Sequence, residues 1–318
     1  MPNKNLYIFS GESYMVRESL SKLKASLDIQ MEELNVTIYN EMPDTQQLIE
    51  ACAAVPFLSE MRLVAVRDCA ILTPSGSKEE AKRLADYIDR LPDTTVLALC
   101  TPDAPDKRKT LYKRAGEIGV VKEFEAPNPT VCAAFAAEQA KKHGARINAA
   151  AAQQLVALAG CNYYALENEV GKLAVYSNFG EITATHVNAC VAKSLEYNVF
   201  EIHKLFVNRQ ASQAETMLND LMEDERPEML LGLFARKMRD MYKVKTMLDA
   251  GYGQGKIAAM LGMKPFPVQM LAKECARFSQ EELRNALGLL AELDFSMKSG
   301  RCDSSLGMAE TLARAYKL

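Results

Sequence analysis

The first 126 residues alternate short apolar runs with amphipathic stretches. The apolar runs predict five strands, at Leu6–Ser10, Asn35–Tyr39, Arg62–Arg67, Thr95–Cys100 and Val120–Phe124. Several are almost continuously apolar, as in Val96–Leu99, which is typical of parallel strands buried on both faces. Helical patterns lie between them, near residues 12–26, 44–54, 77–90 and 107–116. This alternation predicts right-handed crossovers and an open α/β sheet.

After the proline-rich break at Pro127–Thr130 the pattern becomes helical, and we expect no further strands. Ala-rich helical stretches form a small module, at residues 130–143, 148–159, 163–177 and 184–192. From Glu196 to the end we expect seven more helices, at residues 197–208, 211–223, 227–250, 254–261, 266–276, 280–299 and 303–317. The predicted fold class is α/β plus all-α, in three domains at residues 1–126, 127–195 and 196–318.

The turn after the first strand lacks the loop that a nucleotide-binding α/β domain places there. Such a domain carries G-x-x-x-x-G-K-[ST], whose backbone N–H groups and lysine hold phosphates. Here Gly11 is followed by Glu12, with no second glycine and no lysine–hydroxyl pair. A carboxylate at the start of a helix favours the helix dipole and repels phosphate. The sequence therefore indicates a nucleotide-switch scaffold that holds no nucleotide, and it favours an interaction subunit over an enzyme.

Composition narrows the possible partners only slightly. The chain has 318 residues, 48% of them hydrophobic, and a net charge of −3, so no global field draws it onto DNA or an anionic membrane. No stretch of eighteen consecutive apolar residues occurs, and we expect a cytoplasmic protein with no signal peptide or membrane span. Any contact with nucleic acid must then be local or supplied by partners.

Residues that could carry catalysis or bind metal are scattered. The eight cysteines lack a C-x-x-C pair, which is typical of reduced, mostly buried thiols. The three histidines, at 143, 186 and 203, lack metal-ligand spacing and are expected at the surface or at helix ends. A nucleotidase needs a pair of carboxylates at the end of a strand to hold magnesium. Asp68 follows a strand but has no acidic neighbour, so we expect it to be a solvated acid. We therefore predict no catalytic residue, cofactor or metal.

A basic run follows the fourth strand, at Lys107, Arg108, Lys109, Lys113 and Arg114. Asp106 before it is a candidate N-cap for a short helix that spreads these charges around its surface. The run is then either a solvated helix face or a patch that follows phosphates or meets an acidic partner.

A second ambiguous segment lies at residues 254–276, where a helix, a turn containing Gly262 and another helix are predicted. This order resembles a helix-turn-helix, but the second helix opens with prolines and apolar residues instead of base-reading polar ones. A hairpin within a helical bundle is the alternative.

The link between the helix at 44–54 and the strand at 62–67 carries adjacent apolar residues, Pro56, Phe57 and Leu58. Pro56 stiffens the link. Phe57 and Leu58 either cap the sheet or form an exposed apolar wedge, which on a protein surface usually marks a partner site.

Taken together, several segments resemble one family, the delta subunit of the bacterial DNA polymerase III clamp loader. The opening Tyr7–Glu18 is similar to the family's strand-Gly-Glu-x-Tyr-x-x-Arg-Glu start. Further similar segments follow in order along the whole chain, at Asp106–Lys109, Leu166–Leu173, Tyr176, Ile182–Thr183, Phe200–Ile202, Pro227, Arg236, Arg239, Ile257–Ala258, Leu261–Gly262, Phe278–Ser279, Asp294 and Lys298–Gly300.

The resemblance implies an AAA+-like first domain without a working ATP site, a small helical lid-type domain and a helical collar that packs with other subunits into a ring of five. It implies a non-catalytic subunit that opens the sliding clamp, the beta subunit, by inserting an apolar wedge. The expected partners are that clamp, the ATPase subunits gamma and tau, the delta-prime subunit and primed DNA within the complex, at the nucleoid during loading. The matching wedge positions are Pro56 and Phe57, with Leu58 beside them; the family usually has leucine where Pro56 stands. Read from the residues alone, a divergent P-loop-like NTPase and a helix-turn-helix DNA-binding protein remain alternatives.

Overall fold

The structure is a computed structural model that describes residues 5–263 and 265–316. The chain divides into two compact units. The first holds the chain up to Phe135 together with Cys161–Glu167, and the second holds Ala136–Gly160 and the chain from Asn168 onward. This division passes through helices α6 (Pro129–Lys142) and α8 (Tyr163–Tyr176), so the three predicted domain boundaries stay a prediction.

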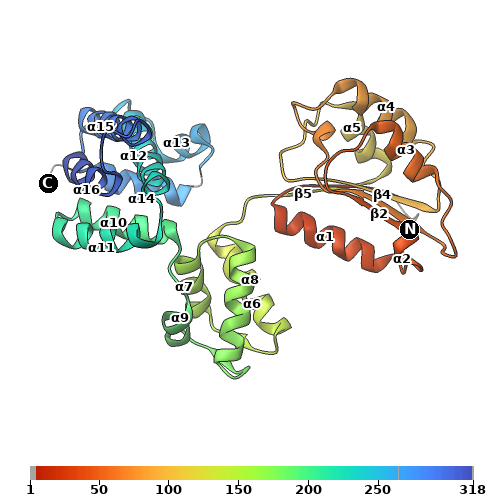
Figure 1. The fold of residues 1–318 in the computed structure, drawn as a ribbon, viewed down its shortest axis with the longest axis horizontal. Coiled ribbons are helices and arrows are strands. Elements are labelled where there is room, and N and C mark those ends of the chain that lie inside the picture. Colours follow the sequence, from red (N-terminus) through yellow and green to blue (C-terminus); the bar gives the residue numbers. More distant parts are fainter. Residues whose placement is uncertain (1–4, 264, 317–318) are drawn as a thin grey trace. The chain divides into compact units, whose positions relative to one another are not determined.

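The first unit contains a sheet of five parallel strands in the order β2-β3-β4-β1-β5 (Figure 1). The strands match their predicted positions to within one residue at each end: β1 Leu6–Gly11, β2 Val36–Tyr39, β3 Arg62–Val66, β4 Thr95–Thr101 and β5 Val120–Phe124. Every residue of β3 and β4 is buried, because these strands are central and both faces of the sheet are covered. The edge strands β2 and β5 are only partly buried.

Alternate side chains of the strands enter two separate cores. On one face, Ile8, Val64 and Leu97 pack under α3 (Thr45–Ala53), α4 (Lys78–Ile88) and α5 (Thr110–Ile118). On the other face, the neighbouring residues Phe9, Leu63 and Val96 pack against α1 (Ser13–Ser26). Figure 1 shows α1 below the sheet and the other three helices above it. The predicted α/β architecture is therefore confirmed.

Two short elements of the first unit were not predicted, and one helix start was wrong. A single helical turn, α2 (Glu32–Asn35), precedes β2, and the 3₁₀ turn η1 (Ala70–Leu72) follows β3. Helix α5 begins at Thr110 with Lys109 as its N-cap. Asp106 is not that cap, because its carboxylate accepts the Arg108 N–H at 3.1 Å in a turn that precedes the helix.

The second unit is helical apart from one small strand pair. Arg146–Ile147 (β6) and Glu181–Ile182 (β7) pair in parallel, so the expectation of no strands after residue 126 was wrong. The helices lie near their predicted positions: α7 Ala149–Ala159, α9 Ala184–Cys190, α10 Leu195–Val207, α11 Ala211–Asp224, α12 Pro227–Asp249, α13 Gln254–Leu261, α14 Pro265–Cys275, α15 Gln280–Lys298 and α16 Ser304–Ala315. Within residues 5–263 and 265–316, no helix combines the length and apolarity needed to span a bilayer.

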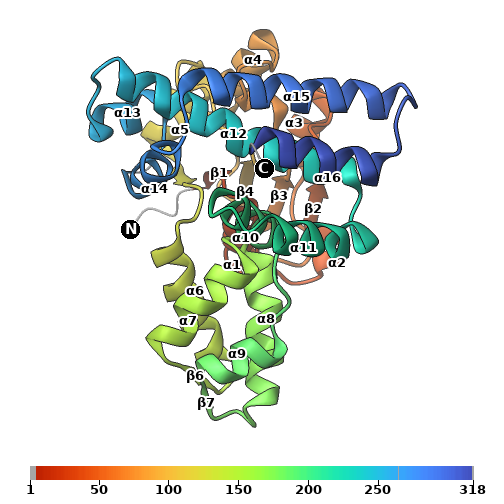
Figure 2. The same ribbon diagram turned by 90° about the vertical axis from the view of Figure 1, so that its left-hand side faces the viewer.

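Helix α12 is the centre of the C-terminal core and packs against α14, α15 and α16 (Figure 2). Its buried Phe234, Met238 and Met241 face these neighbours. Helices α13 and α14 turn their apolar residues, among them Ile257 and Val268, into the same core. They therefore pack as a hairpin of the bundle; residue 264 of the connecting turn lies outside the described residues.

One histidine departs from the expected surface positions. His203 of α10 is buried; the Tyr316 hydroxyl bonds its Nδ1, and its Nε2 lies 3.4 Å from the Glu274 carboxylate. Burial lowers the pKa of His203, so the folded chain favours a neutral ring. The isolated histidine in the sequence gave no sign of these partners, which lie far away along the chain. All eight cysteines are free and five are buried, as predicted.

Candidate functional site

The carboxyl end of β1 meets α1 at Gly11 and Glu12, where a nucleotide-binding domain would hold phosphate. Gly11 has a φ of +99°, and a Cβ atom there would lie 2.0 Å from the Phe124 carbonyl oxygen. The Glu12 N–H donates to the same oxygen at 3.0 Å. The turn is thus closed against β5 in a conformation that suits only glycine.

The N-terminus of α1 already holds an anionic group. Glu12 is the N-cap, and its Oε2 accepts the Met15 N–H at 2.9 Å. This carboxylate uses a free N–H of the first turn and offsets the helix dipole, the two features that would otherwise attract phosphate. The corner therefore has its own internal anion.

Aromatic side chains pack around the second residue of α1. The ring of Tyr14 lies 5.0–5.6 Å, centroid to centroid, from its three aromatic neighbours, Phe135, Tyr163 and Tyr164. The Tyr14 hydroxyl donates to Glu167 at 3.1 Å, and burial together with this acceptor raises the pKa of Tyr14. These contacts fill the space around the first turn of α1 with side chains of the chain itself.

Away from this corner, Asp68 is exposed at the end of β3. Among the described residues, no group of three His, Cys, Asp or Glu side chains could hold a metal ion.

The link between α3 and β3 exposes apolar side chains at the opposite end of the strands. Phe57 is 54% exposed, Leu58 71% and Val55 85%. We call these three residues the apolar tip; Pro56 between them is partly buried. Phe57 and Leu58 therefore do not cap the sheet. Leu58 has a φ of +49°, a left-handed conformation that costs energy for a residue with a side chain.

Two further exposed apolar residues lie in the segment whose Gln30 and Asn35 are hydrogen-bonded to the link. Met31, just before α2, and Leu34, within α2, are each more than half exposed. Helix α2 lies at the same end of the sheet as the link (Figure 1). The hydrophobic pattern did not predict them, because α2 is only one turn long. Their signal was the pair of apolar residues flanking Glu32 and Glu33 in a polar stretch.

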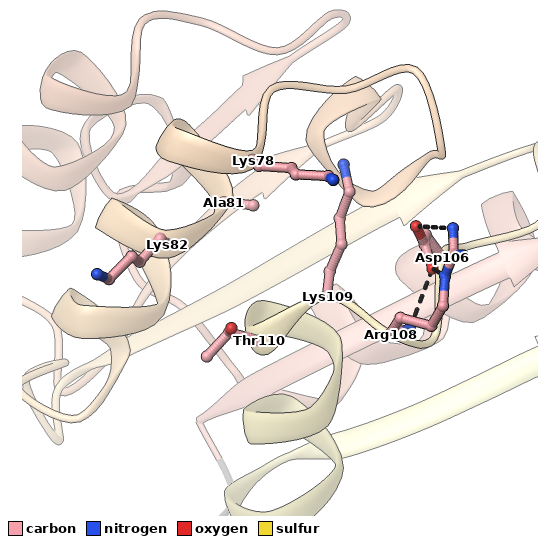
Figure 3. Close-up of a pocket in the computed structure, with 7 residues that line it drawn as sticks. All are labelled: Lys78, Ala81, Lys82, Asp106, Arg108, Lys109 and Thr110. Carbon is pink, nitrogen blue, oxygen red and sulfur yellow. Dashed lines mark hydrogen bonds and ion pairs between the residues drawn. The ribbon is translucent and has the colours of Figure 1, made fainter.

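The basic run borders a cavity of about 460 Å³ at the starts of α4 and α5 (Figure 3). Lys109 lies at its wall and is only 7% exposed, with its Nζ donating to the Ile71 and Gly76 carbonyls at 2.8 Å each. Burial lowers the pKa of Lys109. This lysine therefore connects the start of α5 to η1 and to the loop that follows η1.

The other basic side chains of the run differ in how free they are to contact DNA or a partner. Arg108 pairs with Asp106 at 2.9 Å, and its hydrogen bonds lower the pKa of Asp106 to about 2. Lys107 lies 2.8 Å from the Glu123 carboxylate, and Lys113 is exposed on α5. The prediction of a DNA or partner contact is accordingly narrowed to Lys107, Arg108 and Lys113.

Two family models match the chain, one in each of its halves. The model described as DNA polymerase III, delta subunit, matches residues 7–125, and the model of the C-terminal domain of the DNA polymerase III delta subunit matches residues 196–315. A relative from Bacillus subtilis, DNA polymerase III subunit delta, is 30% identical over 94% of this chain and 89% of its own length. The chain belongs to the DNA polymerase III delta subunit family. The solved structure of the Bacillus subtilis DNA clamp loader delta protein is 29% identical, with a TM-score of 0.73, and the match covers 99% of this chain and 96% of that one.

In this delta-family chain the apolar tip lies at one end of the parallel strands, and the corner after β1 and the basic run lie at the other end. The apolar tip precedes β3 and so lies at the amino edge, whereas Gly11, Glu12 and the basic run follow β1 and β4 at the carboxyl edge. Strands of five to seven residues separate these edges by roughly 17–23 Å.

Proposed function

We propose that this chain is the clamp-loader subunit that binds and opens the sliding clamp through its apolar tip, without hydrolysing ATP. Family membership supports a clamp-loader role. The observation that carries the finer proposal is the exposure of Phe57 and Leu58 next to each other on a short link. Large apolar side chains held in water are costly unless a partner covers them.

The mechanism is a shift of population that needs no chemistry in this chain. The tip inserts into an apolar pocket of the clamp, with Phe57 as the principal anchor and Pro56 and Leu58 beside it. If the tip binds the open clamp better than the closed one, binding alone favours opening. ATPase subunits of the loader, gamma or tau, supply the hydrolysis cycle, and the C-terminal helices pack against them and the delta-prime subunit. The complex then places the clamp on primed DNA in the cytoplasm, at the nucleoid.

The test is a titration of the purified clamp with the full chain and with Phe57→Ala. A buried aromatic anchor contributes about 2–4 kcal/mol, so we expect a loss of roughly thirtyfold to a thousandfold in affinity. Phe179→Ala is the matched control, because Phe179 is 55% exposed and lies in the second unit. An affinity of Phe57→Ala equal to that of the wild type would remove the proposed anchor.

A divergent NTPase is the alternative that the sheet itself suggests. The closed turn at Gly11 and the carboxylate cap of α1 argue against it. Because a ligand that binds only the folded state raises the melting temperature, Mg-ATP distinguishes the two functions. We expect no shift. A helix-turn-helix function would require duplex binding by residues 254–276, whose helices instead turn apolar residues into the bundle.

A further inference from the structure

The apolar tip is held from behind by a buried amide. Asn35, the last residue of α2, has no exposed surface. Its Nδ2 donates to the Phe57 carbonyl at 2.8 Å, and its Oδ1 accepts the Phe57 N–H at 2.7 Å. One side chain thus makes both backbone hydrogen bonds of Phe57, as a neighbouring strand would. The second Nδ2 hydrogen goes to the Gln30 carbonyl at 2.7 Å.

Two more side chains, those of Ser59 and Arg62, hold the ends of the same link. Ser59 Oγ accepts the Gln30 N–H at 3.2 Å and donates to the Met61 carbonyl at 2.9 Å. Arg62, which is buried, donates from Nη1 to the Ala54 carbonyl at 3.2 Å. Polar groups inside the unit therefore fix the backbone, while the apolar side chains of the tip point outward. This is the reverse of an ordinary surface loop, whose polar side chains face water.

We infer that Asn35 is a positioning residue for the apolar tip: it fixes the backbone of Phe57 before the clamp binds. The inference rests on the proposed function. A mobile link would lose backbone and side-chain freedom on docking, and that loss would be subtracted from the affinity. A link already held in its bound form avoids this loss. Asn35 touches no partner itself and acts only through the Phe57 backbone.

A purely structural role for Asn35 makes a different prediction. If the amide merely satisfied Gln30 and closed the turn into β2, its loss would lower stability and leave clamp affinity unchanged in the folded protein. The positioning role requires affinity and the local protection of Phe57 to fall together, at temperatures where the variant is fully folded. Amide hydrogen exchange measures that protection directly.

The experiment compares Asn35→Leu, which has similar size and no hydrogen bonds, with Phe57→Ala, the double variant and Thr73→Val, all in the full chain. Thr73 is the matched control, because it is buried and donates to the Ala70 carbonyl at 2.8 Å in a different loop. We expect Asn35→Leu to weaken clamp binding about tenfold and to speed exchange at the Phe57 amide. Thr73→Val should bind as the wild type does. In the Phe57→Ala background, the effect of Asn35→Leu should shrink, because the main anchor is already gone.

The outcomes separate the two proposals. Unchanged binding by Phe57→Ala would overturn the proposed function. Weakened binding by Phe57→Ala together with wild-type affinity of Asn35→Leu would overturn the positioning role alone. Exchange of the Phe57 amide in the wild type at the rate of an unstructured peptide would also overturn it. This last measurement needs no variant, so it decides the question even if Asn35→Leu fails to fold.

Discussion

Leu58 is expected to have opposite effects on folding and on binding. Its φ of +49° places a side chain in the left-handed region, which costs about 1–2 kcal/mol. The same side chain is 71% exposed. Full burial of a leucine is worth about 1.5–3 kcal/mol, so covering the exposed part at an interface contributes about 1–2 kcal/mol.

Substitution by alanine and by glycine separates the two effects. Both variants remove the apolar side chain, and both should lose clamp affinity by about fivefold to thirtyfold. Only glycine relieves the backbone strain, so Leu58→Gly should unfold at higher urea than Leu58→Ala, with a difference of about 1 kcal/mol. Titration with the clamp and equilibrium unfolding in urea measure the two quantities on the same samples.

Phe179 supplies the control, because it also has a positive φ, +58°, and is 55% exposed. Its glycine and alanine variants should differ in stability in the same direction and bind the clamp as the wild type does. Equal stability of Leu58→Gly and Leu58→Ala would refute the argument from strain. Wild-type affinity in both Leu58 variants would show that the side chain makes no contact with the clamp.

Two further predictions concern folding. Gly11→Ala should lower the free energy of unfolding in urea by at least about 3 kcal/mol, because the new Cβ would clash with the Phe124 carbonyl. Gly116 lies in open space on α5, so the control Gly116→Ala should raise the free energy of unfolding by about 0.5–1 kcal/mol. Equal effects of the two substitutions would contradict the account of the corner. Because burial lowers the pKa of His203 below its ordinary 6.5, the unfolded chain takes up this proton first as the pH falls. The stability that the neutral ring contributes is therefore complete above about pH 6.5, and below that pH it declines by at most about 1.4 kcal/mol per pH unit. In His203→Gln the melting temperature should fall less than in the wild type between about pH 7.5 and about pH 5.5. Identical slopes of melting temperature against pH in the two proteins would contradict this prediction.

The hydrophobic pattern was sufficient to predict the five-stranded sheet and the helices longer than one turn. Buried runs such as Arg62–Val66 and Thr95–Thr101 are set by the requirement to fill both faces of a parallel sheet, and that requirement is visible in a single chain. The one-turn α2 and the two-residue strands β6 and β7 are too short to leave a period in the sequence. Their formation depends on neighbours far away along the chain.

Phe57 and Leu58 could be singled out from the sequence, but whether they cap the sheet or are exposed, and which residues hold them, could not be predicted. Phe57 and Leu58 stand out in the sequence because two large apolar residues follow a proline. Asn35 looked like the first residue of a strand, and its hydrogen bonds to Phe57, 22 positions away, arise only from folding. The prediction for Lys109 failed for the same reason. In the sequence it looked like one more surface cation, but in the fold its amine donates to carbonyl groups more than 30 positions away.

The tight joint between β1 and α1 has a consequence for engineering. A phosphate loop spans about eight residues, while here the strand ends at Gly11 and the helix begins at Ser13. No succession of point mutations can lengthen that joint, so giving this corner a phosphate loop would take an insertion and a displaced β5.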